Sequence, residues 1–305
     1  MEVLKVNNLF KSFKGLNVIE DLSFSVKENS IFGFIGKNGA GKTTTMKMIL
    51  GFLEATKGEI YVCGEKVVYG NTSTNKYIGY LPDVPEYYGY MTPKEYLKLC
   101  GEVTGMRKKD IKVKSEELLT LVGLEGINRK ISGFSRGMKQ RLGIAQALLN
   151  EPKLLICDEP TSALDPIGRK EILDILYKVK NKTTIIFSTH ILSDVEKICD
   201  TVGLLNDGKI VMYGNLQEIK SKFKTDSIVI ELQDKDKGLI LEEKLKSIKD
   251  ITEVVVEGKE VKLQVKNMEE VSKDIIKVFA ENNISIRKYE ILEPSLEKLF
   301  LEVVK

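Results

Sequence analysis

The chain has 305 residues, of which 42% are hydrophobic, enough to bury a large core in one large and one smaller domain or in two medium ones. Charged residues make up 30%, but the net charge is only +3, so no global field favours nucleic acid or an anionic membrane as a partner. The four cysteines lie far apart and the chain has one histidine, which favours reduced, packed thiols over a disulfide framework or a zinc site. No apolar run approaches the roughly 18 residues of a membrane span, and the first eight residues lack a signal-peptide pattern, so we expect a cytosolic protein.

Apolar runs typical of strands alternate with segments of three- and four-residue apolar spacing, which is typical of amphipathic helices. Nearly continuous apolar strands are expected where helices cover both faces of a sheet, so this order predicts an α/β domain with parallel strands at its centre. The predicted strands span Leu4–Val6, Asp21–Val26, Ile31–Ile35, Lys76–Leu81, Lys153–Asp158, Thr183–Ser188 and Thr201–Leu205. The predicted helices span Lys42–Gly51, Pro93–Thr104, Lys108–Val122, Gly137–Asn150, Gly168–Lys180 and Ser193–Asp200.

Two further parts are expected around this domain. The helical pattern between Pro93 and Ser132 has no strand, which predicts a helical subdomain at about residues 84–132, and such insertions usually carry partner contacts. Residues 226–305 hold 14 Lys and Arg against 18 Asp and Glu, whereas the preceding part is net positive, so we divide the chain into residues 1–224 and 225–305. The apolar pattern of the second part predicts the order β-α-β-β-α-β, which is that of a small ferredoxin-like α+β domain, and a last helix opened by Pro294-Ser295.

A phosphate-binding loop is the first motif with chemical content. The segment Gly36-Lys37-Asn38-Gly39-Ala40-Gly41-Lys42-Thr43-Thr44 fits G-x-x-x-x-G-K-[ST]. It follows an apolar strand and opens a helix, which is the context that the motif requires. Backbone N–H groups and the helix start surround the phosphates, Lys42 reaches the β- and γ-phosphates, and the Thr43 hydroxyl can bind Mg²⁺. The loop predicts a site for a nucleoside triphosphate.

Three polar residues stand at the ends of predicted strands. Asp158 ends a buried strand, where a carboxylate requires a cation or donors, so we expect it to bind Mg²⁺ through water. Glu159 follows it directly and is a second candidate for the site. The plainer interpretation is a carboxylate in the first turn of a helix, where the helix dipole favours negative charge. His190 follows the strand 183–188, at the sheet edge where ligands bind in open α/β sheets, although a lone histidine is more often structural.

The block Phe134–Asp165 reads F-S-R-G-M-K-Q-R-L-G-I-A-Q-A-L-L-N-E-P-K-L-L-I-C-D-E-P-T-S-A-L-D. With the phosphate loop before it and His190 after it, the chain resembles the ATPase subunit of an ATP-binding-cassette (ABC) transporter, which implies a P-loop NTPase fold. The resemblance covers residues 2–224 in full and continues more loosely to the end. The segment Glu293-Pro294-Ser295-Leu296-Glu297-Lys298-Leu299-Phe300 looks like the ending of the drug- and antibiotic-export branch.

The resemblance implies roles for these residues around ATP. Glu159 polarises the attacking water, His190 contacts the γ-phosphate, and Phe13 stacks on adenine, with Phe10 as a nearby competitor. Ser135 and Gly137 begin a helix, for which Ser135 is also a local N-cap, and the resemblance implies that they bind the γ-phosphate of an ATP held by the opposite subunit. Asp165 lies at a turn that crosses between subunits. A homodimer or heterodimer of nucleotide domains would therefore close around two ATP molecules.

Three places depart from the commonest family pattern. Asp83 stands where a glutamine usually senses Mg²⁺ and the attacking water; an aspartate can still bind Mg²⁺, but it is shorter and negatively charged. Phe134-Ser135-Arg136-Gly137-Met138 replaces Leu-Ser-Gly-Gly-Gln, and Arg136 either approaches phosphate or points to solvent. Lys37 replaces a proline that serves the turn of the phosphate loop, so we expect little effect there.

The resemblance implies an ATP- and Mg²⁺-dependent hydrolase that energises transport through integral membrane permease subunits encoded elsewhere. Because the chain looks like the drug- and antibiotic-export branch, we expect the direction of transport to be export. The helical subdomain would dock on these subunits, so the protein would be peripheral on the cytoplasmic face of the cell membrane, with no nucleic acid as a partner. The alternative is a non-transport ABC ATPase acting on ribosomes or nucleic acid, which usually carries two cassettes or a long coiled coil. A GTPase would need N-K-x-D, and Asn181-Lys182-Thr183-Thr184 has threonine in its last position.

Overall fold

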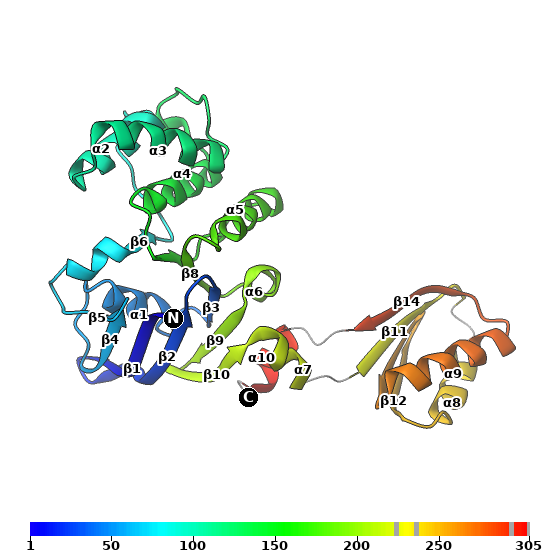
Figure 1. Cartoon of the computed structure of the whole chain (residues 1–305). Coiled ribbons are helices and arrows are strands. Elements are labelled where there is room, and N and C mark those ends of the chain that lie inside the picture. Colours follow the sequence, from blue (N-terminus) through cyan, green and yellow to red (C-terminus); the bar gives the residue numbers. More distant parts are fainter. Residues whose placement is uncertain (223–225, 235–237, 293–295, 304–305) are drawn as a thin grey trace. The chain divides into compact units, whose positions relative to one another are not determined.

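The computed structural model describes residues 1–222, 226–234, 238–292 and 296–303. The chain forms two compact units, one built on Met1–Leu216 and the other on Gln217–Glu302. Figure 1 shows the elements of both units, coloured along the chain. Pro294 and Ser295, which the sequence predicted to open the last helix, lie outside the described residues.

A six-stranded sheet in the order β10-β9-β3-β8-β7-β6 forms the centre of the first unit. Strands β9, β3, β8, β7 and β6 are parallel, and β10 pairs with β9 in the antiparallel sense. β3, β7 and β8 are buried along their whole length, as expected of strands covered on both faces, so the predicted parallel α/β centre is confirmed. The strands span Ile31–Ile35 (β3), Ile78–Leu81 (β6), Leu154–Asp158 (β7), Thr184–Thr189 (β8), Thr201–Asn206 (β9) and Lys209–Asn215 (β10).

A second, antiparallel sheet in the order β2-β1-β4-β5 was not predicted from the sequence. Only short parts of β1 and β2 were expected, and β4, β5 and β10 were missed. Polar residues interrupt these strands: Asn8 and Asp21 adopt positive φ angles of 43° and 51°, and the register between β1 and β2 shifts along the pair. Such irregular, half-exposed strands lack a continuous apolar run. Their bounds are Glu2–Phe13 (β1), Leu16–Lys27 (β2), Lys57–Val62 (β4) and Glu65–Lys66 (β5).

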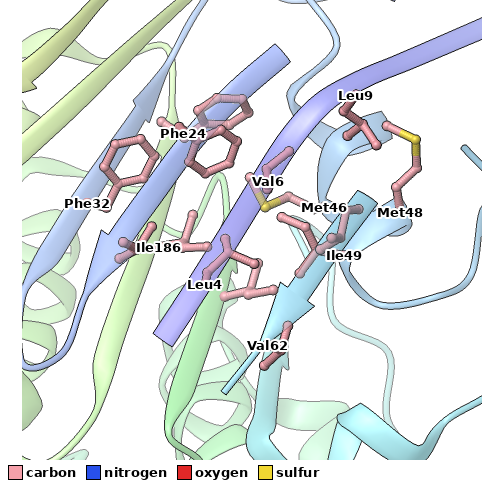
Figure 2. Packing of buried hydrophobic residues seen from close by; sticks show 14 of the residues in the cluster. Leu4, Val6, Leu9, Phe24, Phe32, Met46, Met48, Ile49, Val62 and Ile186 are labelled. Carbon is pink, nitrogen blue, oxygen red and sulfur yellow. The ribbon is translucent and has the colours of Figure 1, made fainter. Parts of the chain in front are cut away.

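One buried apolar cluster joins the two sheets and helix α1 (Lys42–Ile49), as Figure 2 shows. Phe24 of β2 stacks on Phe32 of β3 with ring centroids 5.2 Å apart. Met46 and Ile49 of α1 are fully buried in the same cluster. The helix that follows the phosphate loop is therefore anchored to both sheets, which fixes the direction of its N-terminus.

Helices α2 and α3 lie beside α4 in Figure 1 and form the predicted helical subdomain. Residues 82–153, all of which the structure describes, contain no strand. α2 begins with a capping box in which Thr92 accepts from the backbone of Glu95 and Pro93 occupies the first turn. The helices of the first unit span Pro93–Val103 (α2), Lys108–Leu121 (α3), Arg136–Leu148 (α4), Pro166–Val179 (α5) and Leu192–Ile198 (α6), with short 3₁₀ turns at Ser73–Tyr77 and Ile131–Gly133.

The second unit contains an antiparallel sheet in the order β12-β13-β11-β14, and helices α8 and α9 alternate with its strands in the chain order β11-α8-β12-β13-α9-β14, which confirms the predicted ferredoxin-like α+β domain. Ile228, Leu263 and Phe279 are among the residues of its own buried core. The elements from residue 216 onward span Leu216–Lys222 (α7), Asp226–Leu232 (β11), Gly238–Lys246 (α8), Ile251–Glu257 (β12), Glu260–Val265 (β13), Met268–Glu281 (α9), Ile286–Leu292 (β14) and Leu296–Val303 (α10).

Candidate active site

The phosphate loop connects β3 to α1 through a turn that requires glycine. Gly41 has a φ of 108°, and a Cβ atom there would lie 2.4 Å from Cδ1 of Ile19. A Cβ on Gly36 would lie 2.6 Å from the carbonyl oxygen of Leu205. The other predicted loop residues follow in order: Asn38 and Gly39 are exposed, and Ala40 and Thr44 are half-buried. The loop therefore presents its backbone at the start of a well-anchored helix, a favourable place for an anion.

The Lys42 side chain turns back over this loop. Only 6% of it is exposed, and its Nζ donates to the carbonyl oxygens of Gly36 at 2.7 Å and Lys37 at 3.3 Å. The same Nζ lies 3.3 Å from Oε1 of Glu159. A buried ammonium group is thus held at the loop, between backbone acceptors and a carboxylate.

Asp158 is the last residue of β7 and only 3% exposed. Its Oδ2 accepts a hydrogen bond from the Thr43 hydroxyl at 2.8 Å, and its Oδ1 accepts one from the Ser188 hydroxyl at 3.0 Å. Burial raises the pKa of the Asp158 carboxyl, against the opposing effect of these two hydrogen bonds. Ser188 was missed from the sequence as a site residue, although a hydroxyl at the end of an apolar strand is a usable signal.

Glu159 has a left-handed backbone with a φ of 50°, and its N–H donates to the carbonyl oxygen of Ser188 at 2.9 Å. Such a conformation is uncommon for a residue other than glycine and often occurs at functional sites. Its Oε2 lies 2.9 Å from Nδ1 of His190 and 3.5 Å from the Thr189 hydroxyl, which also accepts from the N–H of Ile191. Its Oε1 is buried and accepts no hydrogen bond from the described residues.

The structure thus brings five of the predicted residues into one contact cluster: Lys42, Thr43, Asp158, Glu159 and His190. A hydroxyl and a carboxylate oxygen at Thr43 and Asp158 fit the oxygen donors of Mg²⁺, which is usually held by one or two carboxylates together with substrate phosphates. The raised pKa of Asp158 fits as well, because a bound cation would offset the burial of its negative charge.

The predicted binding residues beyond the phosphate loop lie outside this cluster, and no hydrogen bond or ion pair in the described structure joins them to it. Ser135 caps α4 and accepts from the N–H of Met138 at 3.2 Å, with Gly137 in the first turn. Asp165 caps α5 and accepts from the N–H of Gly168 at 3.2 Å. Phe13 ends β1 with 43% exposure, and the Nζ of Lys11 lies 4.8 Å from its ring centroid.

The residues that depart from the family pattern also have defined partners. Asp83 follows β6, and its Oδ1 lies 3.3 Å from Nη2 of Arg136. Nη2 of Arg129 lies 2.9 Å from Sδ of Met138. Asp83 is on the same sheet edge as Asp158, because β6 and β7 are parallel neighbours with Leu81 paired to Cys157.

A buried ion pair between α5 and α6 was also missed from the sequence. Nη2 of Arg169 donates to Oδ1 of Asp194 at 2.8 Å, and the Asp194 side chain is fully buried. Arg169 lies one turn after Asp165 and donates its backbone N–H to the carbonyl oxygen of that residue. Asp194 lies near the start of α6, shortly after His190. The pair links the helices that follow two of the predicted site residues, and no local sequence pattern identifies the two partners.

Comparisons with known proteins agree with this geometry. The ABC transporter family model matches residues 19–162, and the model of the C-terminal domain of the DrrA1-3-like ATP-binding proteins matches residues 214–304. The uncharacterized ABC transporter ATP-binding protein YxlF of Bacillus subtilis (strain 168) is 37% identical over 99% of both chains. The bacitracin transport ATP-binding protein BcrA of Bacillus licheniformis is 36% identical, over 99% of this chain and 97% of that one.

Solved structures match the first unit. The structure of an ATP-binding subunit of an ABC transporter has a TM-score of 0.66 and 34% identity, covering 72% of this chain and 93% of that one. CbiO1 of Clostridium perfringens, part of the ABC transporter complex cbiONQ, has a TM-score of 0.67 and 26% identity, covering 72% and 91%. Throughout the described part of the chain, every helix is too short or too polar to cross a membrane. The phosphate loop, the carboxylate pair and these relatives together show that the chain belongs to the ABC transporter family, as an ATP-binding ATPase with a DrrA-like C-terminal domain.

Proposed function

We propose that this chain hydrolyses Mg²⁺-ATP to energise export through separate integral membrane permease subunits. The observation that carries the proposal is the contact cluster, in which Glu159 meets both Lys42 and His190 beside the Asp158–Thr43 pair. Relatives are named for bacitracin transport and linearmycin resistance, which supports export as the direction. These relatives are transport and resistance ATP-binding proteins, which favours this function over an ATPase acting on ribosomes or nucleic acid.

The residues of the cluster divide the work of hydrolysis. Lys42 exchanges its bonds to the loop carbonyls for the β- and γ-phosphates, where its charge offsets theirs. Thr43 and Asp158 would hold Mg²⁺, which would supply positive charge to the phosphate oxygens. The Glu159 carboxylate orients the attacking water and accepts its proton, while His190 contacts the γ-phosphate and holds the Glu159 side chain in place. The Phe13 ring, already half-exposed, stacks on adenine.

The proposal requires two nucleotide domains, in a homodimer or a heterodimer. The start of α4 presents the Ser135 hydroxyl and unpaired N–H groups, which favour an anion, but Ser135 and Gly137 lie outside the contact cluster of their own chain. They are therefore assigned to the γ-phosphate of the opposite subunit, with Asp165 at the crossing between subunits.

Contact with the permease is assigned to the helical subdomain. Val84, Tyr88 and Tyr90 lie after β6 with 64%, 54% and 66% exposure, and exposed apolar side chains of this kind favour a protein partner. The chain would then work at the cytoplasmic face of the membrane, bound there through its partners.

The substitution Glu159→Gln tests the proposed function. We expect the variant to bind ATP, to form a stable ATP-dependent dimer and to lose hydrolysis by roughly a hundredfold or more, as when a general base is removed. Size-exclusion chromatography with light scattering measures the dimer, and phosphate release measures turnover. Glu59→Gln is the control, because Glu59 is an exposed residue of β4. Unchanged turnover in Glu159→Gln would show that another group activates the water.

A further inference from the structure

Two of the departures with a charged side chain, Asp83 and Arg136, are partners of each other. Oδ1 of Asp83 lies 3.3 Å from Nη2 of Arg136, and the side chains are 47% and 44% exposed. Arg136 is the first residue of α4, directly after Ser135. Asp83 follows β6 on the sheet edge that also carries Asp158. The pair therefore connects a helix start assigned to the partner's ATP with the edge that carries the chain's own site.

Buried contacts hold the two backbones in one frame. Gln140 of α4 is fully buried, and its Nε2 donates to the carbonyl oxygen of Asp83 at 2.6 Å. The Tyr87 hydroxyl donates to the carbonyl oxygen of Lys139 at 2.6 Å. A Cβ on Gly143 would lie 2.4 Å from Cδ1 of Leu81, so α4 approaches the end of β6 closely. The segment after β6 and the start of α4 thus keep Asp83 and Arg136 within reach of each other.

The charge of Asp83 already acts at the edge of the site. Burial together with the charges of Asp158 and Asp83 raises the pKa of Tyr80 to about 12. Tyr80 lies in β6, and both carboxylates follow the ends of adjacent strands. The charge of Asp83 thus reaches a residue of β6 that the charge of Asp158 also reaches.

We propose that the Asp83–Arg136 pair couples the two ATP sites of the dimer. Arg136 leaves Asp83 for the γ-phosphate of the partner's ATP, which releases the Asp83 carboxylate at the sheet edge that carries the site of its own subunit. The inference rests on the proposed function, because it needs the shared sites of the closed dimer. It makes the binding of ATP at one site the condition for releasing Asp83 at the edge of the other site.

The relative strengths of the two contacts favour this exchange. The pair in the chain is half-exposed and joined by one 3.3 Å contact, the kind of ion pair that contributes little. A γ-phosphate offers more negative charge and several oxygens, which a guanidinium can bind in a bidentate manner. The helix start beside Arg136 attracts the same anion. The pair is therefore strong enough to hold Arg136 before ATP arrives and weak enough to release it afterwards.

A double-mutant cycle on dimer formation tests the coupling, with the full chain carrying Glu159→Gln as the parent. The ATP concentration for half-maximal dimer is measured by light scattering in saturating Mg²⁺. Asp83→Asn frees Arg136 in advance, so the required ATP concentration falls by about two- to fivefold, the range of an exposed ion pair. Arg136→Gln removes the phosphate contact, so the required concentration rises. The double variant matches Arg136→Gln alone, because Asp83 acts on closure through Arg136.

Lys94→Gln is the matched control, since the Lys94–Glu116 pair is also 3.3 Å long and half-exposed, and it leaves the ATP requirement unchanged. Thermal unfolding of each variant without ATP stays close to that of the parent, because both side chains are half-exposed. The proposed coupling is contradicted if Asp83→Asn leaves the ATP concentration for half-maximal dimer unchanged. It is also contradicted if Asp83→Asn changes that concentration equally in chains with Arg136 and with Arg136→Gln. A parent that forms no ATP-dependent dimer contradicts the proposed function itself, which separates the two failures.

Discussion

At the scale of single residues, the site is a buried carboxylate beside a strained one. Asp158 is held by two hydroxyls and has a raised pKa through burial, and the neighbouring charge of Glu159 raises it further. Glu159 keeps a left-handed backbone and a buried Oε1 that accepts no hydrogen bond from the described residues. Both features are unfavourable in the chain alone and become useful beside a cation and a water.

The substitution Asp158→Asn tests this account at the residue scale. Because the pKa of Asp158 is raised, the folded chain keeps this proton at pH values where the unfolded chain has released it. The contribution of Asp158 to the free energy of unfolding is therefore fully present below the ordinary pKa of 3.8 and is lost as the pH rises through the raised pKa. An asparagine has no such titration. Without nucleotide at pH 7 the variant should therefore unfold at a higher temperature than the wild type.

The same variant should lose the stabilisation by Mg²⁺-ATP, which at a hundredfold excess over Kd is about 2.7 kcal/mol for the wild type. Thermal scans with and without Mg²⁺-ATP measure both effects, and Asp174→Asn, an exposed position on α5, is the control. Retained stabilisation by Mg²⁺-ATP would contradict the assignment of Asp158 as a metal ligand.

Residues within a motif were predictable, and residues that support the motif from elsewhere were not. The phosphate-loop pattern and the strand-end carboxylates identified Lys42, Thr43 and Asp158 as candidates, because their spacing and context are local. Ser188 supports Asp158 from the neighbouring strand, and only the parallel pairing of β7 and β8 places it there. The pairing of Asp83 with Arg136 depends on α4 packing against the end of β6, which no sequence period encodes.

At the scale of elements, α5 and α6 connect the parts of the site. α5 starts at Asp165 and α6 starts just after His190, and the Arg169–Asp194 pair holds them together. Oδ2 of Asp194 is buried and has no hydrogen-bond partner among the described residues. Asp194 therefore depends on Arg169 for compensation of its charge.

Arg169→Met should destabilise the chain by up to about 3 kcal/mol, since it leaves a buried carboxylate without its cation. Chemical denaturation measures the free energy of unfolding. Adding Asp194→Asn should recover part of the loss, because it removes the uncompensated charge. Arg107→Met is the matched control at the Arg107–Asp110 pair, where Arg107 is 85% exposed and we expect at most about 0.5 kcal/mol. Equal losses in the two arginine variants would contradict a structural role for the buried pair.

Elements were predictable where burial gives a continuous or periodic apolar pattern. The buried strands β3, β7 and β8 and the amphipathic helices α2 to α5 begin and end within two residues of their predicted bounds. The antiparallel sheet of β1, β2, β4 and β5 was largely missed, because its strands are half-exposed and bulged. Tertiary packing against the α1 cluster, rather than local apolar content, holds these strands in place.

At the scale of the whole molecule, the account requires that one chain holds two halves of different sites. In the proposed dimer, the phosphate loop and the contact cluster would supply the phosphate contacts, metal ligands and base for one ATP. The start of α4, with its Ser135 cap and with Arg136 as first residue, makes no hydrogen bond or ion pair in the described structure with the cluster residues of its own chain. Two copies in opposite orientation would complete both sites, and an isologous dimer of this kind is the commonest symmetric assembly.

Disulfide formation between subunits tests this central claim most directly. Asn38→Cys and Ser135→Cys are made in separate chains that both carry Glu159→Gln, and the two chains are mixed, so that a bond between the new cysteines must join different subunits. The chain without new cysteines controls for the four native ones, of which Cys157 and Cys199 are buried. An ATP-dependent cross-linked dimer is expected in the mixture, strongest with Mg²⁺-ATP and reduced with ADP. No cross-link in the mixture, despite ATP-dependent dimers of the parent, would contradict the shared site.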